Sequence, residues 1–236
     1  MTGSIGPASI LLVVSSLAAV FYLRRPHDTE LRSLAHERRW EPFTYPNIGA
    51  THDLQFETPP GYVVDRYGVT LGYGRDCFER ARRAVQRFDM YPPQWTSVHF
   101  PYGISIIDTG LLFVAVVRHF GFYSALPCRI VYKLDDSICD PVAVHNDPTT
   151  GVENGDRGVA QVYRFGFALG TLPGHAESGE ERFWVSWDPH SDTVRYDVVA
   201  FSRPHAVLAR LGYPLTRMLQ QRFARDSLAN MVRVVG

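Results

Sequence analysis

The chain has 236 residues, of which 45% are hydrophobic, and its 24 basic and 24 acidic side chains give a formal net charge of zero. This length accommodates one good-sized domain with an appendage. The absence of net charge argues against a nucleic-acid-binding protein held by bulk electrostatics. The three cysteines lack C-x-x-C spacing and the histidines are scattered. The sequence therefore predicts reduced thiols, with no disulfide framework, metal site or cofactor.

The first feature along the chain is an uncharged apolar stretch over residues 5–23. Its 19 residues are enough for a helix that crosses a ~30 Å hydrocarbon core. Residues 1–4 carry no basic side chain, which disfavours a cleaved signal peptide. A buried core helix is also disfavoured, because it would show a polar stripe and this stretch has none. Arg24 and Arg25 follow at once, so the positive-inside rule places the bulk of the chain on their side. We expect a single-pass anchor over residues 1–25 in an organellar membrane, mitochondrial or plastid.

A short amphipathic helix is expected next, because Leu31, Leu34 and Ala35 recur at helical spacing after Asp28 and Thr29. Residues 26–41 are interpreted as a juxtamembrane linker. A globular domain follows over residues 42–236. Residues 135–157 are rich in Asp, Asn, Pro and Gly and predict a long polar insertion within that domain.

Strands dominate the domain. Phe165, Phe167 and Leu169 alternate with small residues, which is the period-two pattern of a strand with one packed face. Turn chemistry at 173–174 and 178–179 then separates this strand from the next. By the same criteria we predict strands over 62–71, 96–100, 104–107, 111–117, 128–134, 158–170, 182–187 and 193–201, with a hairpin turn at 108–110.

Two helices complete the prediction. Residues 75–90 place apolar side chains on one face and arginines on the other. A helix begins at 204, is interrupted at 212–214 by Gly and Pro, and continues to the C-terminus. The order indicates an α+β fold in which a curved antiparallel sheet grips a long C-terminal helix, a helix-grip arrangement. Such a grip leaves space between helix and sheet for an apolar cavity.

Five blocks of the sequence resemble, in the same order, an uncharacterised family of bacterial and plant proteins; the blocks are 43–51, 72–81, 127–131, 166–183 and 200–204. The resemblance covers the chain from about residue 42 onward. A plant member of that family is described as a cation-selective channel of the chloroplast outer envelope. The family looks related to the START and birch-pollen-allergen helix-grip superfamily. The resemblance therefore implies a START-like fold, and it brings no catalytic residues with it.

The segment around His175 is the best candidate site. An imidazole near the carboxylates Glu177, Glu180 and Glu181 suits general acid–base chemistry, whereas the structural interpretation is that His175 and Glu180 hydrogen-bond the backbone of their own turn. No nucleophile or metal partner accompanies them. We name this segment the signature loop and expect it to contact a ligand through Gly170, Thr171, Pro173, Gly174, His175, Gly179 and Glu180.

The C-terminal region carries a basic face. We interpret Arg217, Arg222 and Arg225, with Arg24 and Arg25, either as a solvated surface or as contacts to anionic lipid head groups or an acidic partner.

These features favour a non-catalytic, membrane-anchored domain that binds an apolar ligand or lipid, or serves as an accessory subunit of an organellar membrane complex. Two alternatives stay open. One is a channel-like membrane protein, and the other is an enzyme that uses His175 and Glu180.

Overall fold

The structure is a computed structural model that describes residues 20–53, 55–103, 106–135, 162–204 and 213–236. Within these ranges the elements follow in the order β1 (Val20–Tyr22), α1 (Asp28–Arg38), the 3-10 helix η1 (Ala50–His52), β2 (Val63–Tyr73), α2 (Arg75–Gln86), β3 (Thr96–His99), β4 (Leu112–Arg118), β5 (Tyr123–Asp135), β6 (Tyr163–Thr171), β7 (Glu177–Asp188), β8 (Thr193–Pro204) and α4 (Tyr213–Val235). The polar insertion predicted over 135–157 lies outside the described residues except for Asp135, which ends β5.

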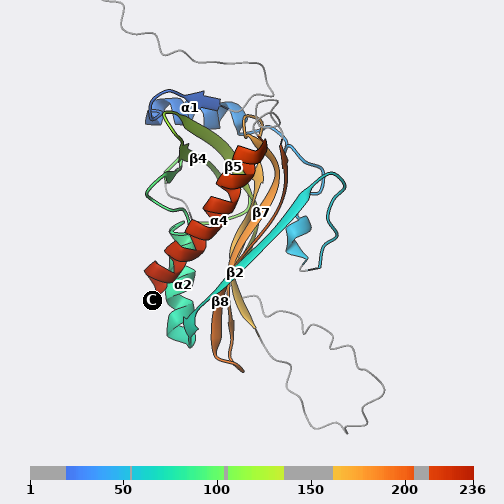
Figure 1. Cartoon of the computed structure of the whole chain (residues 1–236), viewed down its shortest axis with the longest axis vertical. Helices are drawn as coiled ribbons and strands as arrows, with labels where there is room; N and C mark the ends of the chain where they lie inside the picture. Colours follow the sequence, from blue (N-terminus) through green and yellow to red (C-terminus); the bar gives the residue numbers. More distant parts are fainter. Residues whose placement is uncertain (1–19, 54, 104–105, 136–161, 205–212) are drawn as a thin grey trace, which may run out of the picture.

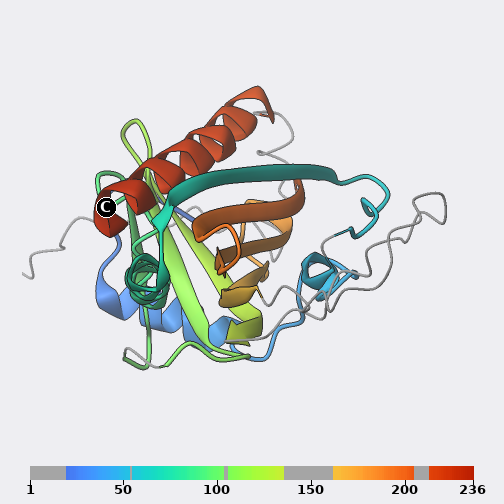
Figure 2. The same cartoon turned by 90° about the horizontal axis from the view of Figure 1, so that it is seen from below.

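One antiparallel sheet carries the fold, with the strand order β2-β8-β7-β6-β5-β4-β3 and β1 paired beside β5. The sheet curves around the long helix α4, which crosses its concave face (Figure 1). Helix α1 lies on the opposite, convex side (Figure 2). The predicted α+β fold, a curved antiparallel sheet with a C-terminal helix, is confirmed.

Glycines allow the sheet to coil this strongly. A Cβ atom added at Gly166 would collide with the backbone of Phe183 and Trp184 in β7. A Cβ atom at Gly179 would collide in the same way with the backbone of Phe201 in β8. Only glycine permits neighbouring backbones to approach so closely, so these two positions are where the sheet can bend over α4.

Aromatic side chains fill one end of the concave side. Phe113, Phe167 and Phe183 are fully buried, and Phe88 packs between them with its ring centroid 5.3 Å from that of Phe113 and 4.9 Å from that of Phe167. Phe88 reaches this place because its φ of 60° ends helix α2 in the left-handed region. This is why the helix predicted to run to residue 90 stops at Gln86.

Helix α1 and the segment after it cover the convex face. Leu31, Leu34 and Ala35 are buried, as their spacing predicted, and they pack with Val114 and Leu172 of the sheet side. The segment 26–41, interpreted as a juxtamembrane linker, therefore contains a helix that belongs to the folded core.

The membrane-anchor prediction needs correction at its C-terminal end. Val20–Tyr22, predicted as the last turn of a helix over 5–23, instead form β1 and pair with Tyr123–Ala125 of β5. None of the helices in the described ranges combines the length and the apolar character that a bilayer span requires. Residues 1–19, which hold the remainder of the predicted anchor, lie outside the described residues.

Three strand predictions also differ from the structure. Residues 106–107 form no strand, and β4 pairs with β3 and β5, so the turn at 108–110 is not a hairpin turn. Strand β7 begins at Glu177, which places 178–179 inside a strand where we predicted a turn. Strand β5 begins at Tyr123 and runs through Pro127, which lies between the residues paired with β1 and those paired with β6. A proline is tolerated at such an interruption of pairing.

Candidate functional site

The concave side of the sheet is hollow at the end away from α2. A cavity of about 690 Å³ lies there between the sheet and α4. Its walls are mainly apolar; the sheet contributes Leu126, Leu169 and Val198, and the helix contributes Leu219 and Phe223. Pockets that bind small molecules in proteins are commonly of this size and character.

The sequence of the strands explains why this end is hollow. On the inner face of β4, Phe113 at the filled end gives way to Ala115. On β7, Phe183 lies at the filled end and Glu181 and Gly179 lie at the cavity. On β8, Tyr196 lies at the filled end and Ala200 lies at the cavity. Smaller or non-aromatic side chains replace rings along three strands, so no single truncation creates the cavity.

Two carboxyl groups of β7 face this cavity. Glu181 lines it and shares the inner face with Phe183. Burial, and to a lesser extent the nearby Asp65, raise the pKa of Glu181 to about 8. Glu177 also lines the cavity, is only 8% exposed, and has a pKa raised to about 7 by burial. The sequence pattern grouped Glu177 and Glu181 with Glu180. In the strand, alternation places Glu177 and Glu181 on the face toward the cavity and Glu180 on the opposite face.

Glu180 points to the convex side and is 2% exposed. Its carboxylate accepts hydrogen bonds from the Tyr45 hydroxyl at 2.8 Å, the Gly49 amide at 2.7 Å and the Thr51 amide at 3.0 Å. These donors belong to the segment around η1, not to the turn that contains Glu180. The carboxylate therefore fastens that segment to β7.

His175 does bond its own turn, as the structural interpretation expected. Its Nδ1 atom accepts a hydrogen bond from the Glu177 amide at 3.0 Å. The side chain also lines the cavity, at the β6–β7 connection. His175 therefore faces the hollow side of the sheet, whereas the carboxylate of Glu180 is held on the other side.

The remaining signature-loop residues hold the β6–β7 hairpin together. The Thr171 hydroxyl accepts a hydrogen bond from the Gly179 amide at 3.0 Å. Gly174 has a φ of 98°, and its carbonyl accepts a hydrogen bond from the Val20 amide of β1 at 3.2 Å. Pro173 is half-buried beside it. A Cβ atom at Gly170 would collide with the Tyr45 hydroxyl and the Phe43 ring. Thr171, His175 and Gly179 contribute to the cavity lining, and Glu180 also borders the cavity although its carboxylate is bound to the segment around η1.

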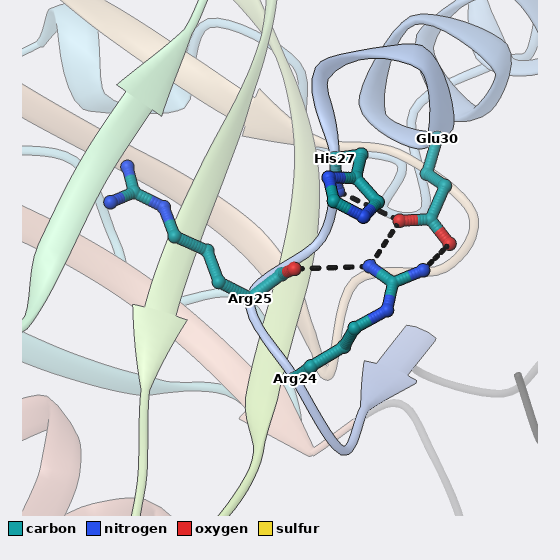
Figure 3. Close-up of polar contacts among 4 residues, drawn as sticks. All are labelled: Arg24, Arg25, His27 and Glu30. Atoms are coloured by element: carbon teal, nitrogen blue, oxygen red, sulfur yellow. Dashed lines mark hydrogen bonds and ion pairs between the residues drawn. The ribbon is translucent and has the colours of Figure 1, made fainter.

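Two of the basic residues predicted to contact lipid or a partner lie near the start of α1 (Figure 3). Arg24 donates two hydrogen bonds to the Glu30 carboxylate, at 2.8 and 2.9 Å, and Glu30 also accepts a bond from the His27 amide at 2.7 Å. Arg25 directs its side chain away from this cluster. Arg24 thus helps to cap α1.

The three arginines of α4 are placed differently from one another. Arg217 donates to both oxygens of Asp65 in β2, at 2.6 and 2.9 Å, and both side chains are about 20% exposed. Arg222 contacts Asp226 at 3.4 Å and lies over the Trp95 ring. Arg225 is exposed. The predicted basic face is therefore partly used to attach α4 to the sheet and to Trp95.

The fold and the cavity together define an α+β helix-grip domain with an internal, ligand-sized cavity. The chain belongs to the family described as "Domain of unknown function (DUF1990)", whose model matches residues 44–230. This confirms that the sequence resembles an uncharacterised family.

Relatives come from distant lineages. A UPF0548 protein of Dictyostelium discoideum is 30% identical over 230 residues, which cover 92% of this chain and 96% of the relative. A UPF0548 protein of Deinococcus radiodurans is 28% identical over 225 residues and is covered completely, with 92% of this chain aligned. A UPF0548 protein of Arabidopsis thaliana is 29% identical over 176 residues, 75% of each chain. The names of these relatives state no activity, and they do not support the alternative that the chain is a channel.

Two solved structures are similar at low sequence identity. A hypothetical protein of Helicobacter pylori aligns with a TM-score of 0.45 and 12% identity, over 83% of this chain and 96% of its own. The protein Ara h 8.0201 aligns with a TM-score of 0.41 and 10% identity, over 73% of this chain and 99% of its own.

Proposed function

We propose that the chain is a non-catalytic binding protein that holds an apolar small molecule or a lipid in the cavity between α4 and the sheet. The single observation that carries this proposal is the 690 Å³ cavity with its mainly apolar walls. Burying a methylene group of a ligand contributes roughly 0.8 kcal/mol, so a short alkyl chain in such a cavity gains enough free energy for measurable binding.

The neighbouring core supports a preformed site. The same concave face is filled with buried rings at its other end, and Tyr196 of β8 hydrogen-bonds Ser227 of α4 at 2.9 Å. The ion pair between Arg217 and Asp65 attaches the helix again beside the cavity. Helix and sheet are therefore held apart at fixed positions, which keeps the space open without a ligand.

Native mass spectrometry of the purified full-length protein tests the proposal. We expect a bound small molecule or lipid to be retained in gentle conditions and to be lost in Ala200→Phe, which places a ring in the cavity. Ala229→Phe adds the same ring on the exposed side of α4 and should retain the ligand. Equal occupancy in the two variants would place the ligand elsewhere and contradict the proposal.

Membrane attachment through the apolar N-terminal segment is a second part of the proposal, supported by the sequence of that segment. Because β1 begins at Val20, 15 residues of the apolar stretch precede it, over 5–19. A transmembrane helix needs about 17–25 residues, so binding to one face of an organellar bilayer fits this length better than a full span.

The test of attachment is the deletion of residues 1–19, which leaves β1 and the Arg24–Glu30 contact intact. We expect the deletion to move the protein from the membrane fraction to the soluble fraction. Unchanged membrane association of the shortened, folded protein would show that another surface or a partner subunit of the membrane holds it.

A further inference from the structure

The register of the sheet places Glu181 in the middle of the cavity wall. Asp65 of β2 pairs with Ala200 of β8, Ala200 pairs with Glu181 of β7, and Glu181 pairs with Leu169 of β6. Directly paired residues point to the same side of a sheet. These four side chains therefore form one row across the cavity, in which Glu181 is flanked by a methyl group and a leucine.

Charge compensation within this row is uneven. Asp65 is neutralised by the bidentate contact with Arg217. The side chain of Glu181 makes no hydrogen bond or ion pair with another residue in the part of the chain that the structure describes. Tyr91, Tyr196 and Cys128 also interact electrostatically with Glu181; burial raises the pKa values of all three groups, so they are neutral at pH 7.

Glu177 gives a second, independent indication. It lies four residues before Glu181 on the same strand and also lines the cavity. Its side chain is more than nine-tenths buried, and its Oε1 atom has no hydrogen-bond partner among the described residues. His119, on the cavity wall, is neutral at pH 7 because burial lowers its pKa. Arg217 is the cation whose field reaches Glu177, and its guanidinium group is already bound to Asp65.

A carboxyl group that is shielded from bulk water and has no partner is costly in a protein. From the cavity, the row of paired residues and these two unpartnered carboxyl groups we propose that the ligand is a cationic amphiphile, with an ammonium group at Glu181 and an apolar tail against Leu219 and Phe223. This inference rests on the proposed function and specifies the chemical class of the ligand. Binding of the ammonium group holds Glu181 in its charged form.

The test compares three ligands that share a decyl chain and differ at the head group: decyltrimethylammonium, decan-1-ol and decanoate. Each is titrated by calorimetry into the full-length protein below its micelle concentration. We expect the ammonium compound to bind at least about tenfold more tightly than the alcohol, which corresponds to about 1.4 kcal/mol, and decanoate to bind most weakly.

Three variants locate the effect. Glu181→Gln should remove the preference for the ammonium compound while the affinity for decan-1-ol is kept, which also reports a folded cavity. Glu177→Gln should weaken the preference less, because Glu177 is not placed at the ammonium group. Glu57→Gln alters an exposed carboxylate and should leave all three affinities unchanged.

The outcomes separate this inference from the proposed function. Equal or tighter binding of decan-1-ol or decanoate by the unaltered protein overturns the cationic ligand and leaves apolar binding in place. Loss of the preference in Glu177→Gln instead of Glu181→Gln overturns the assignment to Glu181. No binding of any of the three ligands contradicts the proposed function itself.

Discussion

The carboxylate of Glu180 accepts hydrogen bonds from both the backbone amide and the hydroxyl group of Thr51, a residue 129 positions earlier in the chain. Thr51 is itself fully buried. The bond therefore ties the loop around η1 to the first part of β7, on the face opposite the cavity. Hydrogen bonds to a charged acceptor contribute about 1.5–3 kcal/mol each, so this contact is a major attachment of the loop.

Glu180→Gln should lower the free energy of unfolding by about 2–3 kcal/mol. The carboxylate accepts from Tyr45, Gly49 and Thr51 through two oxygens, whereas the glutamine side chain has only one acceptor oxygen and its NH₂ group would face a donor. Urea unfolding of the variant measures this change. Glu57→Gln, at an exposed position, should stay within about 0.5 kcal/mol of the unaltered protein. A stability of Glu180→Gln that equals this control would contradict the structural role of the carboxylate.

Arg217→Gln should lower the free energy of unfolding by about 1–3 kcal/mol, because the half-buried Asp65 loses both of its charge-assisted hydrogen bonds. Arg225→Gln removes an exposed arginine from the same helix and should change stability by less than about 0.5 kcal/mol. The two variants are compared by urea unfolding in the same buffer. Equal effects would show that the contact with Asp65 adds nothing to the attachment of α4.

Gly170→Ala should destabilise the protein by about 1–3 kcal/mol, because the new methyl group overlaps the Tyr45 hydroxyl and the Phe43 ring. The loop must move away from β6 to make room, so the hydrogen bond between Tyr45 and Glu180 should weaken as well. Thermal unfolding measures the loss. A variant as stable as the unaltered protein would mean that the loop packs against β6 less closely than the structure has it.

The pH dependence of stability follows from Glu181 and Glu177. Their pKa values are raised in the folded protein, to about 8 and about 7, so the folded state binds protons that the unfolded state has released above pH 4.5. Stability should therefore fall as the pH rises from about 5 to about 8. Each group contributes a slope of at most about 1.4 kcal/mol per pH unit.

The contribution of Glu181 is isolated by comparing unfolding of the unaltered protein and of Glu181→Gln between pH 5 and pH 9. The variant should show a shallower decline, since glutamine does not titrate. A decline of the same steepness in both proteins would mean that Glu181 is solvated like an ordinary surface carboxylate.

The alternation of large and small residues was sufficient to predict β6, and the amphipathic pattern was sufficient to predict α2 and the part of the closing helix from Tyr213 onward. The predicted helix start at 204 is wrong because Pro204 ends β8, and residues 205–212 lie outside the described residues. The start of β7 was missed because Ser178 and Gly179 have turn chemistry and the following charged residues resemble a solvated loop. Those charges are accommodated by tertiary contacts, Glu180 by the Thr51 segment and Arg182 by the Thr51 carbonyl and the Trp184 ring. No local pattern reveals such partners.

The site was predicted in part. The space between helix and sheet followed from the predicted architecture, and the signature loop does border it. Which carboxylates face the cavity depends on whether β7 includes Glu177 to Glu181, and a turn at 178–179 hid that alternation. Once the strand is recognised, period two alone assigns Glu177 and Glu181 to the inner face and Glu180 to the outer face.

The central claim is that the cavity between α4 and the sheet binds an apolar molecule, and a titration with the neutral fluorophore N-phenyl-1-naphthylamine tests it most directly. The fluorescence should rise and saturate with the unaltered protein and with Ala229→Phe, and should stay near the free-probe level with Ala200→Phe. Saturable binding of the same strength by a folded Ala200→Phe protein would contradict the claim.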